Sequence, residues 1–347
     1  MSKRLLITGH TGFIGSCLTP LALDHGYDVV GLDTGYFRDC TMGDCNSSVT
    51  EIHKDIRDIT LADLEGIDAV IHLAALSNDP LGNINSTWTE SINYEAAVSL
   101  AALAKQAGVR RFLFSSSCIM YGVSEAARVN EESPLDPQTV YAESKVHSER
   151  EISKMANDHF SPTFLRNGTI YGYSSRIRLD TVLNNLTASG FTTGKVVLYS
   201  DGSPWRPVIH VEDVVQAFLL ILEAPIEVVH NQAFNIGAES CNSQIRDLAN
   251  AVAEQLPSCE VIYSSKPGAD QRTYITDFSK IGREIPDFQL RWNVEEGVDS
   301  LIRTFQNHSL SYNQFSGRKF IRLSWLEHLL NQDCLDSQLR WRKKQVF

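Results

Sequence analysis

Residues 3–16 read KRLLITGHTGFIGS, a short apolar strand that runs directly into a loop with three glycines. Gly9, Gly12 and Gly15 have the spacing G-x-x-G-x-x-G, and a helix is expected over 14–25. Glycine permits a tight turn at this point, and the N–H groups of a helix N-terminus favour a pyrophosphate. The stretch therefore predicts the first strand, turn and helix of a doubly wound fold that binds a dinucleotide.

Short apolar strands alternate with helical segments beyond this loop. Strands are expected over 28–32, 68–74, 111–115 and 195–199, and helices over 93–107 and 242–256, the last capped by Asn242 or Ser243. Such alternation is typical of βαβ units in a parallel sheet that is covered on both faces. The fold class predicted is α/β, a Rossmann-type doubly wound parallel sheet with a smaller C-terminal substrate-binding lobe.

The domain division follows from where this alternation loosens, after Gly172. We expect a Rossmann domain that binds the dinucleotide over 1–172, to which 205–237 returns, and a substrate-binding lobe over 173–204 and 238–306. Residues 307–347 are expected to be a C-terminal extension, with an amphipathic segment that reads RKFIRLSWLEHLL. A docking element, a lid and a dimer contact are all open roles for this extension.

Composition narrows the class of protein. The net charge of −11 argues against a nucleic-acid partner, because phosphate binding usually leaves a basic footprint. No apolar stretch approaches the ~20 residues of a membrane span, so no membrane association is expected. Seven scattered cysteines fit reduced thiols of a cytoplasmic protein. Cys40 and Cys45 lack a second ligand pair, so no metal site is expected.

An acidic residue at the end of the second strand indicates the cofactor. Asp33 follows Gly15 by 18 residues, close to the ~20-residue offset of a ribose-binding acid. Its carboxylate would accept hydrogen bonds from both adenosine ribose hydroxyls and repel a 2′-phosphate, which favours NAD over NADP. Asp55 and Ile56 follow a third short strand and are expected to bracket the adenine.

The motif YAESK places two functional side chains on one helix face. Tyr141 and Lys145 are four residues apart, so both lie on the same side. A lysine ammonium near a phenol lowers the phenol pKa from about 10 and yields a base that can take a hydroxyl proton. Ser117, at the end of the preceding strand, is the candidate that binds the substrate oxygen.

These motifs together resemble the extended short-chain dehydrogenase/reductases, specifically the NAD-dependent nucleotide-sugar epimerase/dehydratase family. The resemblance covers about residues 3–305. It is carried by TGHTGFIG (8–15), Asp33, HLAA (72–75), Asn93, SSSCIMYG (115–122), YAESK (141–145), LRNGTIYG (165–172) and WRPVIHVEDV (205–214).

The resemblance implies a role for each matching residue. Ser117 binds the reacting oxygen, Tyr141 is the acid/base, and Lys145 also holds the nicotinamide ribose. The cofactor contacts are Gly9, Gly12, Phe13, Ile14, Gly15, Asp33, Asp55, Ile56, Leu73, Ala74, Ala75, Asn93, Tyr141 and Lys145. The substrate contacts are Ser77, Ser117, Cys118, Asn167, Thr169, Arg206 and Arg272, of which the arginines face the nucleotide diphosphate.

Departures from the family pattern bear on the reaction. In the 4,6-dehydratase branch, Asp and Glu follow the strand-end threonine, whereas Cys118 and Ile119 follow Ser117 here. Isoleucine can neither donate nor accept a proton, so dehydration by that machinery is not expected. We expect Cys118 to be a spectator packed beside the nicotinamide. Thr169 stands where many relatives carry Asn, with Asn167 displaced toward the arginine.

The reaction predicted is 4-epimerisation of a nucleoside diphosphate hexose, or a related sugar, through a transient 4-keto intermediate. An NAD(P)-dependent 4-dehydrogenase or ketoreductase would use the same residues. A catalytically silent NAD-sensing scaffold is the alternative from a different class. The resemblance also implies a homodimer formed through helices at about 93–107 and 141–157.

Overall fold

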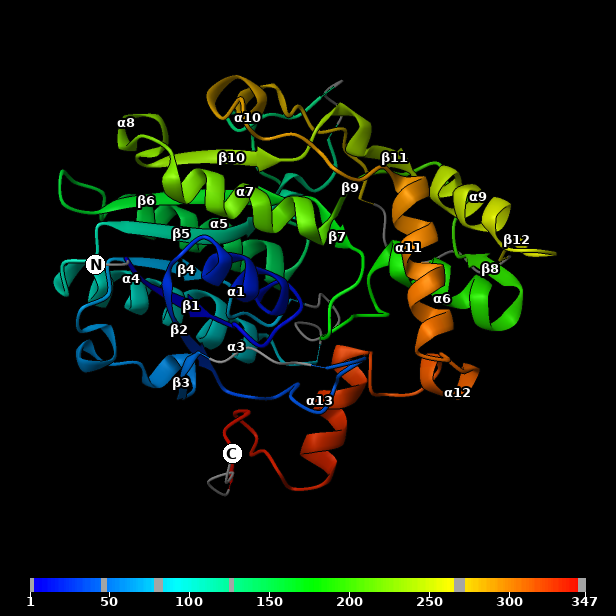
Figure 1. The fold of residues 1–347 in the computed structure, drawn as a ribbon, viewed down its shortest axis with the longest axis horizontal. Coiled ribbons are helices and arrows are strands. Elements are labelled where there is room, and N and C mark those ends of the chain that lie inside the picture. The colour runs from blue at the N-terminus through cyan, green and yellow to red at the C-terminus, as the bar shows by residue number, and fades with distance from the viewer. Residues whose placement is uncertain (1–2, 45–48, 78–83, 125–127, 265–271, 343–347) are drawn as a thin grey trace.

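A computed structural model describes residues 3–44, 49–77, 84–124, 128–264 and 272–342. They form a large unit built on one central sheet and a smaller lobe beside it (Figure 1). The strands of the sheet point their carboxyl ends toward the lobe. In a parallel sheet the loops at that edge converge, so a site between the two units draws residues from both.

The central sheet has seven strands in the order β10-β6-β5-β4-β1-β2-β3, and all neighbouring strands are parallel. They are β1 (Arg4–Thr8), β2 (Asp28–Asp33), β3 (Thr50–His53), β4 (Ala69–His72), β5 (Arg111–Ser117), β6 (Ser161–Asn167) and β10 (Gln232–Ile236). This order confirms the predicted Rossmann-type sheet.

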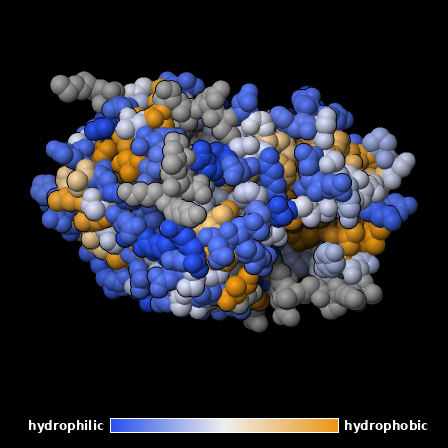
Figure 2. All heavy atoms as spheres, turned by 90° about the horizontal axis from the view of Figure 1, so that it is seen from below, coloured by the Kyte–Doolittle hydropathy of each residue, from blue (hydrophilic) through white to orange (hydrophobic). Residues whose placement is uncertain are grey.

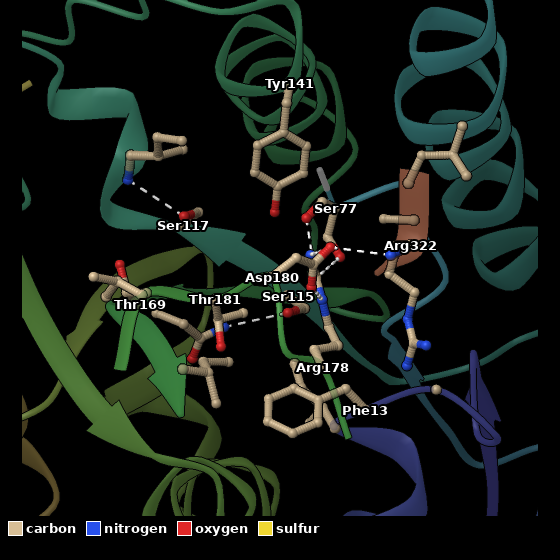
Figure 3. Close-up of a pocket in the computed structure, with 18 of the residues that line it drawn as sticks. Phe13, Ser77, Ser115, Ser117, Tyr141, Thr169, Arg178, Asp180, Thr181 and Arg322 are labelled. Carbon is tan, nitrogen blue, oxygen red and sulfur yellow. Dashed lines mark hydrogen bonds and ion pairs between the residues drawn. The ribbon is translucent and has the colours of Figure 1, made fainter. Parts of the chain in front are cut away.

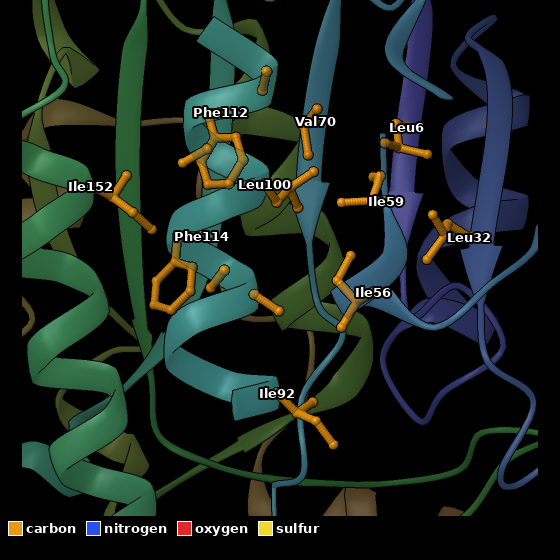
Figure 4. Close-up of a cluster of buried hydrophobic side chains, with 14 of the residues drawn as sticks. Leu6, Leu32, Ile56, Ile59, Val70, Ile92, Leu100, Phe112, Phe114 and Ile152 are labelled. Carbon is orange, nitrogen blue, oxygen red and sulfur yellow. The ribbon is translucent and has the colours of Figure 1, made fainter. Parts of the chain in front are cut away.

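Alternating side chains of the strands feed two cores, one on each face of the sheet. Leu5 and Ile7 point to one core, whereas Leu6, Phe112 and Phe114 point to the other (Figure 4). The first core is covered by α1 (Gly15–Asp24) and α7 (Val211–Glu223), and the second by α4 (Ala96–Gln106) and α5 (Val140–Ser153). Residues 211–223 therefore cover the central sheet.

The smaller lobe has a third core of its own. It consists of α6 (Val182–Thr193), α9 (Ile245–Gln255), α11 (Val294–Asn307) and α12 (Tyr312–Phe315) around the parallel pair β8 (Lys195–Leu198) and β12 (Glu260–Tyr263). Leu183, Leu248 and Leu301 are fully buried where three of these helices meet.

A three-stranded sheet, β11-β9-β7, connects the two units. It contains β7 (Thr169–Tyr171), β9 (Trp205–His210) and β11 (Asn242–Gln244). The predicted start of a helix at 242, with Asn242 or Ser243 as its cap, is wrong: these residues pair antiparallel with β9, and the helix begins at Ile245 after Gln244. Extended backbone that pairs with a strand cannot also form the first helical turn.

The remaining elements are short, apart from one helix in the C-terminal extension. They are α3 (Ser86–Thr89), a π-helical turn η3 (Glu90–Glu95), α8 (Ile226–Val229), α10 (Ser279–Glu284), α13 (Arg322–Asn331) and the 3₁₀ turns η1 (Ile56–Asp58), η2 (Leu61–Leu64), η4 (Cys118–Tyr121) and η5 (Glu239–Cys241).

The helices and the surface bear on whether the chain could enter a membrane. Within the described ranges, no helix is long and apolar enough to cross a membrane. On the face drawn in Figure 2, hydrophilic side chains predominate and hydrophobic ones lie in separate patches.

Candidate active site

A cavity of about 1150 Å³ lies between the carboxyl edge of the sheet and the lobe. It brings together most of the side chains predicted for the site. Those that line it are Gly9, Gly12, Phe13, Ile14, Gly15, Asp33, Asp55, Ile56, Leu73, Ala74, Ala75, Ser77, Ser117, Tyr141, Lys145, Asn167, Thr169, Arg206 and Arg272. Asn93 and Cys118 are predicted residues that do not line it.

The glycine loop is packed too closely for any side chain. Gly9 has a φ of 74°, and a Cβ there would lie 2.8 Å from the backbone nitrogen of Ala74. A Cβ on Gly15 would lie 2.2 Å from the Gly9 carbonyl oxygen. The loop can therefore bring its backbone close to a ligand, at the N-terminus of α1, where the helix dipole favours an anion.

Asp33 lies at the end of β2, beside the glycine loop. Its Oδ1 accepts a hydrogen bond from the Gly35 N–H at 2.8 Å, and its Oδ2 accepts one from the Thr11 N–H at 3.3 Å. These bonds hold the carboxylate in place while Asp33 remains part of the cavity lining. This geometry fits the predicted contact with an adenosine ribose.

Asp55 is engaged more tightly than the prediction required. Its carboxylate accepts hydrogen bonds from the Arg57 side chain at 2.9 and 2.6 Å. Burial raises the pKa of Asp55, but the hydrogen bonds and charge of Arg57 outweigh burial and hold that pKa below its usual value. Because the Asp55 carboxylate is bonded to Arg57, the apolar side chain that this segment contributes to the cavity wall is that of Ile56.

Three elements place the predicted catalytic residues around one space. Ser117 ends β5, and its Oγ accepts a hydrogen bond from the Ile119 N–H at 3.3 Å. Tyr141 lies in the first turn of α5, which begins where the Thr139 side chain accepts a hydrogen bond from the Ala142 N–H. In Figure 3 the Tyr141 hydroxyl points into the cavity toward Ser77, with Ser117 to one side.

Lys145 lies one helical turn after Tyr141 and is buried. Its Nζ donates a hydrogen bond to the Ser115 carbonyl at 2.7 Å and lies 5.6 Å from the centroid of the Tyr141 ring. Burial lowers the pKa of Lys145 to about 7, and the nearby Glu149 carboxylate acts in the opposite direction. An ammonium at this place stabilises negative charge on the Tyr141 oxygen.

Cys118 is turned away from the cavity, which corrects its prediction as a substrate contact. Its side chain is fully buried, and its Sγ donates a hydrogen bond to the Arg166 carbonyl at 3.1 Å. Burial raises the pKa of this thiol. The turn η4 instead presents Ile119 to the cavity. Neither residue after Ser117 offers a proton-transferring group there.

Asn93 also lies behind the wall rather than in it, which corrects its prediction as a cofactor contact. Its amide donates to the Leu76 carbonyl at 3.0 Å and accepts from the Leu76 N–H at 2.8 Å. The side chain thereby satisfies the backbone of the loop that carries Ala74 and Ala75. Asn93 is only 1% exposed and acts on the cavity through that loop.

The polar residues predicted for the substrate lie toward the lobe. The Asn167 amide donates to Ser115 Oγ at 3.2 Å, and its Oδ1 is buried without a hydrogen-bond partner among the residues that the structure describes. Thr169 follows on β7. Arg206 donates to the Arg272 carbonyl, so the two arginines reach the cavity from adjacent chain segments. Two guanidinium groups at one place provide charge suited to a diphosphate.

Sequence reasoning did not find a charged group in the middle of the cavity. Arg178 donates to Ser77 Oγ at 2.7 Å, and its Nε donates to Asp180 at 2.9 Å. The segment 173–181 that carries this pair crosses from the lobe to the glycine loop, where Arg176 donates to the Thr11 carbonyl at 3.2 Å. The signal was the basic run RIRLD just after the predicted lobe boundary.

Other residues that line the cavity and were not predicted include Tyr36, Phe37, Thr181, Ile321, Arg322 and Leu323. The described residues contain no group of three or more His, Cys, Asp or Glu side chains that could hold a metal ion. Cys45, half of the pair considered above, falls outside the described residues.

The fold and the cavity define an NAD-binding enzyme of the Rossmann type. The cradle without side chains at Gly9 and Gly15, the N-terminus of α1 and the carboxylate of Asp33 fit a dinucleotide with free ribose hydroxyls. Residues 5–237 match the model of the NAD dependent epimerase/dehydratase family, and the chain belongs to that family.

Individual relatives are distant but match over most of their length. A UDP-glucose 4-epimerase from Mycolicibacterium smegmatis is 27% identical in an alignment of 325 positions that covers 88% of this chain and 99% of that protein. The solved structure of MoeE5 in complex with UDP-glucuronic acid and NAD is 27% identical with a TM-score of 0.76, and the match covers 88% of this chain and 100% of MoeE5.

A third match shares the fold but is named for a different reaction. The structure of TunA, an NAD-dependent NDP-hexosamine 5,6-dehydratase, has a TM-score of 0.79 at 24% identity and covers 88% of this chain and 98% of TunA. Each of these three matches leaves about an eighth of this chain without a counterpart.

Proposed function

We propose that this protein is an NAD-dependent nucleotide-sugar 4-epimerase that acts through a transient 4-keto sugar. The observation that carries the proposal is the convergence of Ser117, Tyr141 and Lys145 on one cavity that also holds the glycine loop and two arginines. The relative from Mycolicibacterium smegmatis, a UDP-glucose 4-epimerase, supports a nucleotide-sugar substrate.

The chain's own residues supply the proton chemistry and the positioning. Ser117 binds the 4-hydroxyl, Tyr141 takes its proton as a phenolate, and Lys145 stabilises that phenolate. When bound, NAD supplies a reversible hydride acceptor. After oxidation the ketosugar rotates in the cavity, so that the hydride returns to the opposite face of C4. Tyr141 then gives the proton back to the oxygen, which yields the opposite epimer. Arg206 and Arg272 hold the diphosphate while the sugar turns.

The residues after Ser117 argue against dehydration. That reaction needs an acid and a base beside the sugar ring, whereas Cys118 is buried and Ile119 has no group that can donate or accept a proton. A net dehydrogenase or ketoreductase would use the same three catalytic residues. The two reactions differ in cofactor turnover, because an epimerase regenerates NAD in every cycle.

We also propose that the protein is a cytoplasmic homodimer, paired through α4 and α5. The described cysteines, Cys17, Cys40, Cys118, Cys241, Cys259 and Cys334, are all free, which fits a reducing compartment. Light scattering of the full chain should give twice its mass of 38.7 kDa, and a monomer alone would refute the pairing.

A panel of nucleotide sugars tests the reaction, with sugar identity and NADH absorbance followed together. Interconversion of 4-epimers without net NADH supports the epimerase, whereas stoichiometric NADH identifies the dehydrogenase. Tyr141→Phe should lower turnover by roughly 10²–10⁴ and preserve ligand binding, since a positioned acid/base contributes about that much. Cys118→Ala should stay within a few-fold of the wild type. Full activity of Tyr141→Phe would exclude this mechanism.

A further inference from the structure

The described part of the C-terminal extension packs along the β2–β3 edge of the sheet. In Figure 1, α13 and the red segment that follows it lie on the β3 side of the molecule, and Trp341 in that segment bonds to the loop that leaves β2. Leu326, Leu335 and Leu339 are at most 1% exposed, and they belong to the same core as Leu32 and Ile56. The extension is therefore part of the cofactor-binding unit rather than a free tail.

The extension holds the loop that follows Asp33. Trp341 Nε1 donates to the Thr34 carbonyl at 2.7 Å, and Trp325 Nε1 donates to the Tyr36 carbonyl at 2.8 Å. The Tyr36 hydroxyl donates in turn to the Leu339 carbonyl. Asp33, Thr34 and Tyr36 all line the cavity. The indole N–H groups of Trp325 and Trp341 therefore hold the backbone of the cavity wall that follows Asp33.

The neighbouring wall, after β3, is held in the same way. Arg57, which binds Asp55, also donates from Nη1 to the Gln338 carbonyl at 2.8 Å. Arg340 lies 3.4 Å from the Asp55 carboxylate and 2.5 Å from that of Asp58. The predicted adenosine contacts are Asp33, Asp55 and Ile56. The segments that carry them, 33–37 and 55–56, therefore depend on contacts with the extension.

The start of α13 reaches the cavity itself. Ile321, Arg322 and Leu323 line it. In Figure 3, Arg322 lies on the opposite side of the close-up from Ser117. Arg322 is 5% exposed, and its guanidinium carbon lies 4.5 Å from the centroid of the Phe37 ring. Its Nη2 donates to the carbonyl of Arg176, whose own side chain bonds the glycine loop. Contacts through this arginine link the extension to the pyrophosphate end.

Charge at this end complements a diphosphate. Asp180 accepts hydrogen bonds from the Arg178 side chain and from the Arg322 backbone N–H, and the Arg322 side chain also donates to the carbonyl of Arg176. Burial lowers the pKa of Arg322 to about 10, so the guanidinium is charged at neutral pH. Among these four residues the net charge is positive, beside the glycine loop.

We propose that the C-terminal extension is a wall of the cofactor site, one that encloses the adenosine diphosphate half of NAD and slows its release. This inference rests on the proposed function, because an epimerase regenerates its cofactor in every cycle. Slow release of NAD therefore does not limit its turnover. The extension acts by positioning residues 33–37 and 55–56, and it presents Ile321 and Leu323 to the cofactor directly.

Release of NADH from the full-length protein tests this wall without any sugar present. Protein loaded with NADH is mixed with excess NAD, and the loss of bound NADH fluorescence gives the release rate. The double variant Trp325→Phe with Trp341→Phe keeps both rings and removes both N–H donors. Its release should be at least about tenfold faster than that of the wild type.

A matched control separates the wall from general loosening. Trp292 Nε1 donates to Glu212 at 2.9 Å and stacks on His210 in another part of the fold, so Trp292→Phe should leave the release rate unchanged. A rate within twofold of the wild type in the double variant would overturn the proposal. An equal acceleration in the control would also overturn it. Neither result depends on which sugar reaction the protein performs.

Amide hydrogen exchange of the wild type gives an answer even if the double variant does not fold. ADP-ribose should slow exchange of residues 334–342 by about threefold or more, because it fills the half of the site that the extension encloses. Nicotinamide mononucleotide, which lacks the adenosine, should leave that exchange unchanged. Unchanged exchange with ADP-ribose, when it is bound, would refute the wall.

Discussion

Removal of the buried charge at Lys145 should change how stability depends on pH. Burial lowers the pKa of Lys145 from 10.5 to about 7 in the folded protein. Between these values the unfolded chain binds the lysine proton and the folded chain does not, so stability rises with pH. Below pH 7 the full cost of burying the charge is present.

The size of the effect follows from the two pKa values. One pKa unit corresponds to about 1.36 kcal/mol. Integrated from pH 7 to pH 9, a shift from 10.5 to about 7 gives the wild type about 2 kcal/mol of extra stability from this lysine. Lys145→Met keeps an unbranched side chain beside Phe114 and removes the titrating group, so it should lack this gain.

Urea unfolding at pH 7 and pH 9, followed by tryptophan fluorescence, measures both proteins. Groups away from this part of α5 titrate alike in the two proteins, so the difference between their pH responses isolates Lys145 together with its coupling to Tyr141. Lys154→Met is the matched control, because this lysine lies at the end of the same helix with its side chain 62% exposed. Parallel pH responses of the wild type and Lys145→Met would refute a lowered pKa at Lys145.

Three further substitutions test the site and its support. Glu149→Gln should lower the free energy of unfolding by about 3–5 kcal/mol, since it leaves the buried Arg166 guanidinium without its carboxylate. Glu151→Gln, which breaks an exposed ion pair with Lys154, should lower it by about 1 kcal/mol or less; urea unfolding measures both. Gly15→Ala should abolish NAD binding in calorimetry, because its Cβ has no space. Gly282→Ala should bind NAD normally, because outside its own helix its Cβ would meet no atom of the described residues within 4 Å. Asp33→Ser should reduce the preference for NAD over NADP about tenfold or more, and an unchanged ratio of affinities would exclude the ribose contact.

Local spacing in the sequence was enough to predict much of the site. Three glycines between a strand and a helix predict a dinucleotide loop, and residues four apart on a helix share a face, as Tyr141 and Lys145 do. Ser117 was predictable because a parallel strand delivers its last residue to one edge of the sheet. These inferences need only the periodicity of one element and its direction.

Tertiary structure alone decided the features that depend on where separate segments meet. The chain after Ser117 turns so that Ile119 faces the cavity and Cys118 the core. The start of the helix at Ile245 depends on the pairing of the three preceding residues with β9, which lies far away in sequence.

The role of the extension is the clearest case of this kind. Its sequence shows an amphipathic segment, but an apolar face does not specify the surface that covers it. Trp325 and Trp341 bond to backbone carbonyls about 300 residues earlier in the chain, and a carbonyl has no identity in the sequence. Only the folded chain brings these groups within hydrogen-bonding distance, so only the folded chain makes the extension part of the cofactor site.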